Sequence, residues 1–324
     1  MSKGYDVIGH ATTEFVRANN RTVQLKHPGD PDEVLQRLAD MRGRPEVVFI
    51  AIPPIDKGEV SLTYKLHYLS QGIPVVSAEK RAMAYHPHKL VPYLPILGFD
   101  AMVSGNARVI SASRERRIRH ERVRVFAVLN GTVNHNLTRV QNDGDMLSMA
   151  CDLARRLGYA EPDDDKADGE LRQFRGELYG DVPSKVAVYH NLVCVGKEGP
   201  FITPDDFKVN EFDGPDLEWF ADAGKRYRYV VVFTNGNVLE KIDINAPGSF
   251  TLRKGEWRIS GGFLEMPKGT FYGDWVPNGV GNGILIEYLD GHNGPVPLAA
   301  PGAGPGPTTD TMFQDADRLL DVPY

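Results

Sequence analysis

The sequence predicts an α/β protein in two parts: a doubly wound half-sheet of parallel strands, and an α+β domain whose open sheet is covered by helices. The unbroken apolar run at 47–52 is typical of a strand buried on both faces. A helical segment at 61–69 separates it from a second short strand at 73–77. Strand-like segments then gather between 225 and 290, which favours a second and separate sheet.

The first helix is expected at 32–39, and the residues before it lack the pattern that opens a dinucleotide-binding sheet. Such a sheet begins with a strand, a Gly-x-Gly-x-x-Gly loop and a helix whose N-terminus receives a pyrophosphate. Residues 1–29 contain only Gly4, Gly9 and Gly29. The glycine-rich phosphate loop is absent from this sequence, so the half-sheet is predicted to be incomplete.

An arginine-rich segment separates two further predicted strands at 101–110 and 123–129. Residues 114–124 contain six arginines. Phosphate binding is one interpretation of this segment, and a solvated helix face with Glu115 and Glu121 as partners is the other. We favour the solvated face.

The remaining elements follow from periodicity and turn signals. A helix at 145–157 carries one apolar stripe and ends at Gly158, and a helix at 182–193 is apolar nearly all round. The tetrapeptide Thr234-Asn-Gly-Asn237 predicts a hairpin. The strands expected in this half of the chain are 227–233, 238–244, 257–259, 270–275 and 284–288.

Composition limits the classes of partner. The 37 Lys and Arg residues against 43 Asp and Glu give a formal charge of −6, which provides no electrostatic reason for nucleic-acid or anionic-membrane binding. No stretch approaches the roughly 18 to 20 apolar residues of a membrane span, and residues 1–20 lack the order of a secretory signal. We therefore expect a cytoplasmic protein. Cys151 and Cys194 are interpreted as buried free thiols.

Two lysines stand where ligand chemistry is expected. Asp181 and Lys185 lie four residues apart at the start of a predicted helix, so they share a face, either as a site or as a surface ion pair. The apolar helix that follows favours a position for Lys185 at the edge of buried surface. Lys80 ends a parallel strand at its carboxyl edge, where open α/β sheets bind ligands. Two cations at one crevice would suit an anionic or carbonyl substrate.

Five motifs, taken in order, resemble those of the homoserine dehydrogenase family. Val75–Ala84 (VVSAEKRAMA) is similar to VVTANKxxxA, and Leu129–Asn134 (LNGTVN) is similar to LNGTTN. The other three motifs are Gly158–Asp163 (GYAEPD), Asp181–Lys185 (DVPSK) and Pro301–Gly304 (PGAG). The resemblance covers residues 75 to 304.

The resemblance implies an architecture and a reaction. Residues 1–104 and 300–324 would form an incomplete Rossmann-like nucleotide-binding domain, and 105–299 a catalytic and dimerisation domain. The implied reaction is reversible hydride transfer between NADP(H) or NAD(H) and L-aspartate 4-semialdehyde, giving L-homoserine, in a homodimer that serves threonine, methionine and isoleucine biosynthesis. The alternative is a non-catalytic or repurposed homologue that binds a small amino-acid-like ligand without a dinucleotide.

The resemblance also assigns roles to residues. Lys185 would donate and accept the proton at the substrate hydroxyl, Asp181 and Glu161 would hold the amino group and hydroxyl region, and Lys80 would lie between cofactor and substrate. Further substrate-binding candidates are Asn130, Gly131 and Thr132. The candidates at the nicotinamide end of the cofactor are Lys80, Gly158, Gly304 and Gly306. A sodium site would combine the Asp100 carboxylate with the backbone carbonyls of Val103, Gly105 and Ala107.

Two departures from the family pattern concern the same site. Glu79 stands beside Lys80 where the family has Asn, and we expect its charge to face an approaching cofactor phosphate or substrate carboxylate. Extra residues separate Glu161 from Asp181, and Asp168 is the candidate for the carboxylate that the family carries between them.

Overall fold

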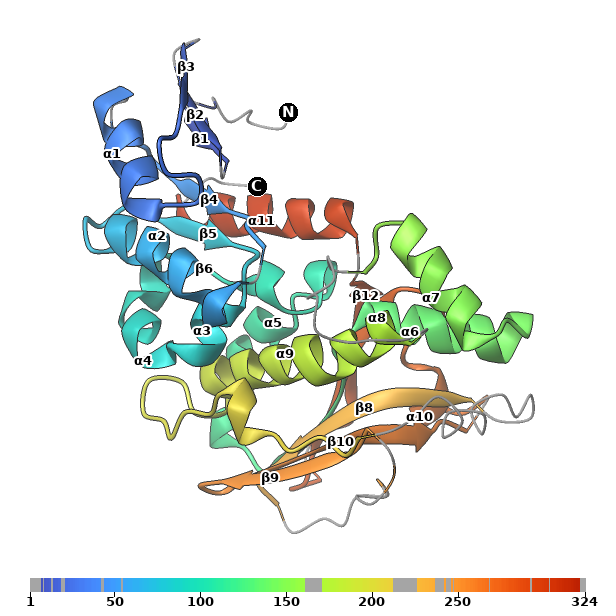
Figure 1. Cartoon of the computed structure of the whole chain (residues 1–324). Helices are drawn as coiled ribbons and strands as arrows, with labels where there is room; N and C mark the ends of the chain where they lie inside the picture. The colour runs from blue at the N-terminus through green and yellow to red at the C-terminus, as the bar shows by residue number, and fades with distance from the viewer. Residues whose placement is uncertain are drawn as a thin grey trace.

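A computed structural model of the chain confirms the mixed α/β class, with separate parallel and antiparallel sheets (Figure 1). It describes residues 7, 9–12, 14–18, 21–41, 44–53, 55–160, 171–211, 226–236, 242, 246, 248–267, 269–291, 293–302 and 304–320.

The parallel sheet is short and has the order β4-β5-β6 in the described residues. Its strands are β4 (Val48–Ile50), β5 (Val75–Ser77) and β6 (Leu97–Gly98). The helices of this part are α1 (Pro31–Met41), α2 (Glu59–Leu69), α3 (Arg81–Tyr85) and α4 (Pro87–Leu90). The strands and helices predicted between 32 and 77 are therefore confirmed.

A small antiparallel sheet precedes the parallel one and was not expected from the sequence. It pairs β1 (Gly9–Ala11), β2 (Phe15–Ala18) and β3 (Arg21–Gln24) in that order. Val16, Leu25 and Val34 form an apolar cluster that attaches this sheet to α1.

The C-terminal helix α11 (Pro305–Leu319) runs back along the parallel sheet (Figure 1). Met312 and Ala316 of this helix pack with Val76 of β5 and with Ala101 in one buried cluster. The ring of Phe313 meets that of Phe49 in β4 at a centroid distance of 5.5 Å. Segments from both ends of the chain thus build the part of the fold that carries Lys80.

The antiparallel sheet has the order β12-β11-β7-β8-β10-β9 within the described residues. Its strands are β7 (Val123–Val128), β8 (Tyr227–Thr234), β9 (Phe250–Lys254), β10 (Trp257–Glu265), β11 (Gly281–Tyr288) and β12 (Val296–Pro301). Helices cover one face, as the sequence predicts (Figure 1). Tyr189 and Phe233 show the packing between the layers, with ring centroids 4.7 Å apart.

One long helical segment, residues 172–194, supplies most of that cover. It joins α8 (Arg172–Gly176), a π-helical turn (Glu177–Asp181), α9 (Val182–Tyr189) and a second π-helical turn (His190–Cys194). The helix predicted at 182–193 is confirmed and begins earlier, at Arg172. The covering layer also contains α6 (Gly131–Thr138) and α7 (Leu147–Arg156), which confirms the helix predicted at 145–157.

Two predicted strands are wrong. Residues 101–110 form tight turns and the start of α5 (Val109–Glu115), because Ser104, Gly105 and Arg108 have positive φ, which a strand excludes. Residues 271–274 form α10 (Phe271–Asp274), which the Thr270 hydroxyl caps by accepting a hydrogen bond from the Gly273 N–H. The strand predicted at 238–244 falls largely outside the described residues, and β8 pairs instead with β7 and β10.

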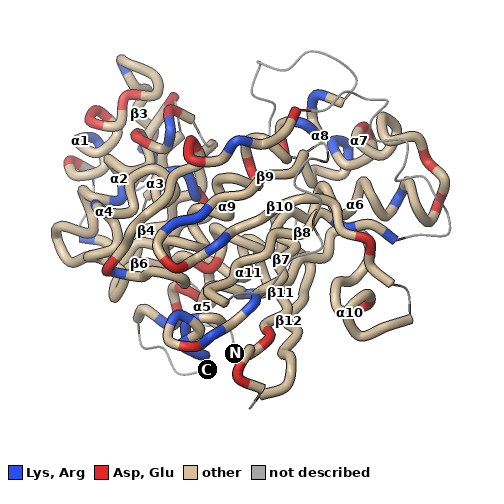
Figure 2. Tube along the Cα trace, turned by 90° about the horizontal axis from the view of Figure 1, so that it is seen from below, with Lys and Arg blue, Asp and Glu red and all other residues tan. Residues whose placement is uncertain are grey.

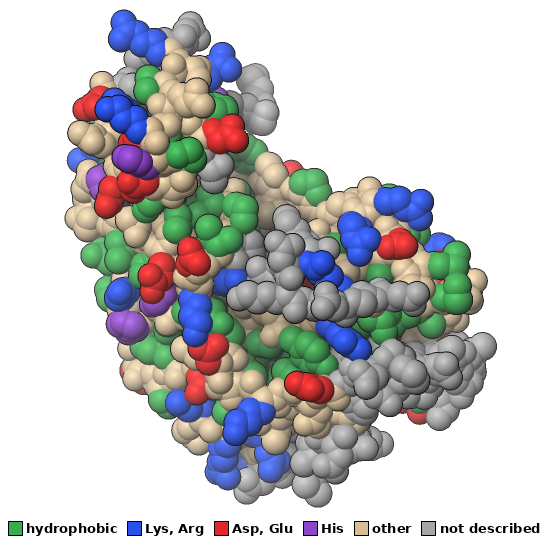
Figure 3. All heavy atoms as spheres, viewed as in Figure 1, with side chains coloured by type: hydrophobic (Ala, Val, Ile, Leu, Met, Phe, Trp, Pro, Cys, Tyr) green, Lys and Arg blue, Asp and Glu red, His purple; other side chains and the backbone are tan. Residues whose placement is uncertain are grey.

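Acidic and basic side chains are interspersed over the face seen in Figure 3. Figure 2 shows one departure, a gathering of Lys and Arg beside α5. None of the helices in the described ranges combines the length and apolar character that a membrane crossing requires. Cys151 and Cys194 are buried free thiols, as expected.

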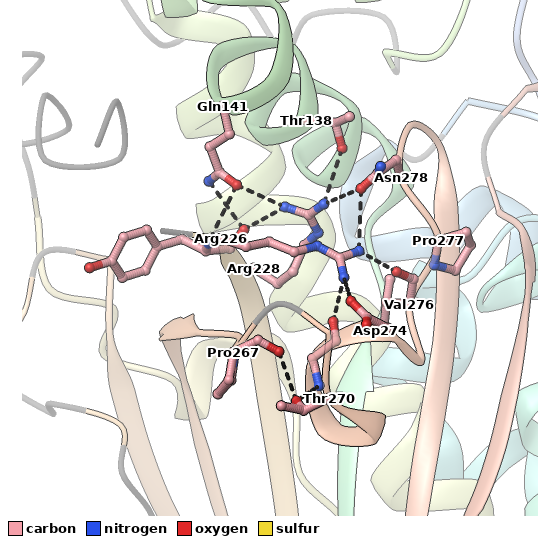
Figure 4. Close-up of polar contacts among 12 residues, drawn as sticks. Thr138, Gln141, Arg226, Arg228, Pro267, Thr270, Asp274, Val276, Pro277 and Asn278 are labelled. Carbon is pink, nitrogen blue, oxygen red and sulfur yellow. Dashed lines mark hydrogen bonds and ion pairs between the residues drawn. The ribbon is translucent and has the colours of Figure 1, made fainter. Parts of the chain in front are cut away.

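A buried arginine anchors the C-terminal end of α6 to the antiparallel sheet (Figure 4). Arg228 of β8 is 1% exposed, and its guanidinium donates to Gln141 Oε1 at 3.1 Å and to Asn278 Oδ1 at 2.8 Å. Burial and the neighbouring Arg226 lower the pKa of Arg228 to about 9. A cation at this position also complements the carboxyl end of the α6 dipole.

Replacing this arginine should destabilise the fold. We expect Arg228→Met to lower the free energy of unfolding by about 1–3 kcal/mol, because the side-chain oxygens of Gln141 and Asn278 each lose one of their donors. Urea unfolding followed by circular dichroism measures the change. Arg253→Met on exposed β9 is the matched control and should leave stability within about 0.5 kcal/mol of wild type. Equal stability of the two variants would contradict the anchoring role.

Candidate active site

A buried carboxylate lies between two lysines where the two parts of the fold meet. Lys80 Nζ is 2.8 Å from Asp181 Oδ1, and Lys185 Nζ is 2.7 Å from Asp181 Oδ2. The side chains of Asp181, Lys80 and Lys185 are 4%, 7% and 13% exposed, respectively. The pair of Asp181 with Lys185 is therefore not a surface ion pair, and Lys185 is the lysine more accessible to a bound molecule.

Asn130 connects this cluster to the antiparallel sheet. It lies two residues after the end of β7 and caps α6, because its side-chain oxygen accepts the Val133 N–H at 2.7 Å. Its amide nitrogen donates to Asp181 Oδ2 at 2.7 Å and to Glu177 Oε2 at 2.6 Å. The cap also places Gly131 in the first turn of α6, beside the cluster.

Glu177 is the buried acidic residue that the sequence analysis missed. It is 5% exposed and lies four residues before Asp181, which itself lies four residues before Lys185. Three charged residues at this spacing share one helix face, and that signal could have found it. Glu161 and Asp168, the carboxylates considered from the sequence, lie outside the described residues.

Electrostatics keep Asp181 ionised. Burial alone would raise the pKa of this carboxyl, but the Lys185 and Lys80 ammonium groups outweigh burial and hold its pKa well below the ordinary range. Both lysines are thereby fixed around one anionic centre, and a carbonyl or carboxylate group could approach the remaining N–H donors of Lys185.

The charge of Glu79 does not face a ligand, which corrects the expectation from the sequence. Its carboxylate is fully buried and binds Lys65 Nζ of α2 at 2.8 Å. It also accepts the backbone N–H groups of Arg81 and Ala82 at the start of α3. Burial would raise the pKa of Glu79, yet the Lys65 charge lowers it on balance. The Glu79–Lys65 pair thus holds the backbone on both sides of Lys80.

The glycines assigned to the cofactor end occupy helix termini. Gly158 ends α7 with φ +70°, and Gly304 precedes α11 with φ +100°. Gly306 lies in the first turn of α11. The Thr132 hydroxyl donates to the Tyr159 carbonyl at 2.7 Å, and a side chain at position 304 would approach the Tyr159 ring at 3.8 Å. Tyr159 therefore lies between the first turn of α6, which Asn130 caps, and the start of α11.

The loop assigned to sodium already contains a cation of its own. Arg108 Nε donates to Asp100 Oδ2 at 3.2 Å, and the Ser111 N–H donates to Asp100 Oδ1 at 2.9 Å. The Gly105 carbonyl accepts the Arg108 N–H at 3.1 Å. As folded here, the carboxylate does not fit a metal site with Val103 and Ala107, because an ion would have to displace Arg108. Among the described residues, no group of three His, Cys, Asp or Glu side chains could hold a metal ion.

The fold and this lysine–carboxylate cluster define a class: two-part α/β proteins in which a Rossmann-like sheet adjoins a helix-covered α+β domain. Residues 109–316 match the family model for homoserine dehydrogenase, and the chain therefore belongs to the homoserine dehydrogenase family.

Curated relatives agree with this assignment over parts of the chain. Homoserine dehydrogenase from Neisseria gonorrhoeae is 28% identical over 177 residues, which cover 52% of this chain and 37% of the relative. The enzyme from Methanocaldococcus jannaschii is 27% identical over 121 residues, 36% of each chain. The matches thus span little more than a third of either relative.

Solved structures support the fold. A homoserine dehydrogenase from Thermoplasma acidophilum aligns with a TM-score of 0.63 at 18% identity, covering 97% of this chain and 90% of that one. A hyperthermophilic archaeal homoserine dehydrogenase in complex with NADPH aligns with a TM-score of 0.57 at 18% identity, covering 95% of this chain and 78% of that one.

Removing the shared carboxylate should destabilise the protein in a pH-dependent way. Asp181→Asn leaves two buried ammonium groups without their anion, for which we expect a loss of about 3–5 kcal/mol near neutral pH. Because the folded pKa of Asp181 is depressed, this stabilisation is present above about pH 4 and is lost as the pH falls through the folded value.

Chemical denaturation of wild type and variant between pH 3 and 7 measures the difference. The control is Asp205→Asn, which breaks the exposed pair with Lys57 and should cost under about 1 kcal/mol. A difference between wild type and Asp181→Asn that stays constant over this pH range would rule out the coupling described.

Proposed function

We propose that the protein is a homoserine dehydrogenase, which interconverts L-homoserine and L-aspartate 4-semialdehyde with NADP or NAD. The observation that carries this proposal is the Asp181 carboxylate shared by Lys80 and Lys185 beside Asn130. Carbonyl reduction needs a proton donor at the oxygen and cations that stabilise developing negative charge, and this cluster supplies both.

The proton step is assigned to Lys185. When bound, the dinucleotide supplies the hydride that reduces the aldehyde carbon. As negative charge develops on the aldehyde oxygen, the Lys185 ammonium donates a proton to it, and in the reverse direction the neutral amine recovers that proton. Asp181 fixes the orientation of Lys185 through the 2.7 Å contact, and Lys80 adds a second positive charge.

The residues at the cofactor end fit a nicotinamide group. Lys80 lies at the carboxyl edge of the parallel sheet, which is the edge that binds ligands in open α/β folds. Gly304 has a φ that favours glycine, and Gly158 has another such φ, so both let backbone pass close to a flat ring. We propose that these residues and Gly306 hold the nicotinamide end, in line with the NADPH complex of the similar archaeal enzyme.

The acidic residues would select the substrate by its amino group. Homoserine and aspartate semialdehyde both carry an ammonium beside a carboxylate. Glu177 adds a buried carboxylate next to Asp181, and we propose that both, with Glu161, face the ammonium. The first-turn amides of Gly131 and Thr132 are suited to the substrate carboxylate. The homodimer implied by the resemblance stays a prediction.

One observation favours a second candidate, a homologue that binds an amino acid without a dinucleotide. The described residues between 9 and 24 form an antiparallel sheet in place of the strand, glycine-rich loop and helix that grip a pyrophosphate. Calorimetric titration separates the two candidates. Saturable NADPH or NADH binding supports the dehydrogenase, whereas homoserine binding with no dinucleotide binding at millimolar concentration supports the second candidate.

The role of Lys185 has its own test. We expect Lys185→Ala to lower kcat for NADP-dependent homoserine oxidation by about 10²–10⁴-fold, because the proton acceptor is lost, while dinucleotide affinity changes little. Absorbance at 340 nm measures the rate. Lys208→Ala, which removes an exposed lysine, is the control and should retain full activity. Equal activity of both variants would refute the assignment of the proton to Lys185.

A further inference from the structure

A cavity of about 360 Å³ lies where the arginine-rich turn after α5 meets the end of the long helical segment 172–194. One wall is formed by Arg114, Arg117, Ile118, Arg119 and His120, and the other by Leu192, Val193, Gly196 and Lys197. Lys185 lies seven residues before Leu192 on the same helical segment, which is roughly 10 Å along the helix axis. The cavity is therefore separate from the candidate active site.

The lining of this cavity is basic and apolar. Its basic members are Arg114, Arg117, Arg119, His120 and Lys197, and none of the described residues that line it is Asp or Glu. This composition is unusual for a chain with a net charge of −6 and with interspersed acidic and basic side chains on the face seen in Figure 3. The gathering of basic residues beside α5 in Figure 2 belongs to this region.

The acidic neighbours expected from the sequence do not neutralise these arginines. In the described structure, neither Glu115 nor Glu121 forms an ion pair, and of the six arginines between 114 and 124 only Arg124 is paired, with Glu287 at 2.6 Å. The expected pairing with Glu115 and Glu121 is therefore wrong, whereas Arg117 and Arg122 are exposed, as the solvated-face interpretation requires. The positive charge of the cavity is left uncompensated by these residues.

The basic groups are held in place by specific contacts. Arg114 donates to the Leu192 carbonyl at 3.0 Å and lies over the Phe99 ring at 5.3 Å. Arg119 donates to His120 Nε2 at 2.8 Å. Gly196 leaves room for this guanidinium, because a Cβ there would lie 2.6 Å from Arg119 Nη1. Preorganised donors of this kind bind an anion without a large loss of side-chain entropy.

The cations that line this cavity repel one another. Partial removal from water and the nearby Arg119 and Arg318 charges lower the pKa of Arg114. An anion between these cations would relieve their mutual repulsion.

We propose that this cavity binds a small phosphate-bearing molecule. Arginine guanidinium groups match phosphate oxygens in bidentate geometry, and several cations around one cavity favour a multiply charged anion. The volume lies within the range of small-ligand pockets. Leu94, Ile118 and Val193 supply apolar surface for the remainder of the molecule. The proposal does not depend on the dehydrogenase activity.

Isothermal titration calorimetry on the full chain in chloride buffer at fixed ionic strength tests the proposal. The probes are inorganic phosphate, pyrophosphate and AMP, with citrate as a carboxylate of similar charge. We expect saturable binding of pyrophosphate or AMP at submillimolar Kd. The double variant Arg119→Gln/Lys197→Gln should weaken it at least about 10-fold, whereas Arg122→Gln, from the same segment but outside the lining, should weaken it less than about 3-fold.

Each other result overturns the proposal. If no phosphate probe binds saturably up to 10 mM, the site is excluded. A Kd above 10 mM corresponds to a standard binding free energy weaker than roughly −3 kcal/mol. Equal weakening in the double variant and in Arg122→Gln would indicate non-specific attraction to the basic segment. Citrate binding as tight as pyrophosphate binding would exclude phosphate as the recognised group. Lys185→Ala should leave the binding unchanged, and loss of binding in that variant would place the anion at the active site instead.

Discussion

The contacts of one buried carboxylate hold the two parts of this fold together. Asp181 meets Lys80 from the parallel sheet, Lys185 from its own helix and Asn130 from the end of β7. A carboxylate this buried is stable as an anion only when cations and donors surround it, so these segments must come together as the chain folds. The same requirement assembles the cluster that a carbonyl substrate would need.

Charge compensation also explains where this chain departs from its family pattern. Glu79 replaces Asn beside Lys80, and Lys65 on α2 balances it inside the protein. Asp100 faces Arg108 in the loop that the resemblance assigns to sodium. In both places a carboxylate lies beside a cation of this chain. Such pairs preserve the backbone around Lys80 and Asp100 while they change which ions or donors those residues can bind.

The fold class and the central cluster of Asp181 and Lys185 could be predicted from the sequence, because apolar runs and short motifs are local signals. Asp181 and Lys185 were predictable from helical spacing, and Glu177 could have been found in the same way. The partners of Glu79 and Asp100 could not be predicted from the sequence, because burial and the approach of α2 or Arg108 depend on tertiary packing. The strand predicted at 101–110 failed for a related reason, since the positive φ angles there are set by the turns around Asp100.

The long helical segment 172–194 has a π-helical turn at each of two sites, the candidate active site and the basic cavity. The first turn contains Glu177 and Asp181, and the second ends at Cys194, beside the basic cavity. A π-helical turn holds an extra residue, so it rotates the side chains that follow it, and such turns are frequent at functional sites. Here Asn130 donates to both carboxylates of the first turn, and Lys185 pairs with Asp181. The carbonyl of Leu192 in the second turn accepts Arg114, so the carboxyl end of this helical segment fixes the cation that a bound phosphate would meet.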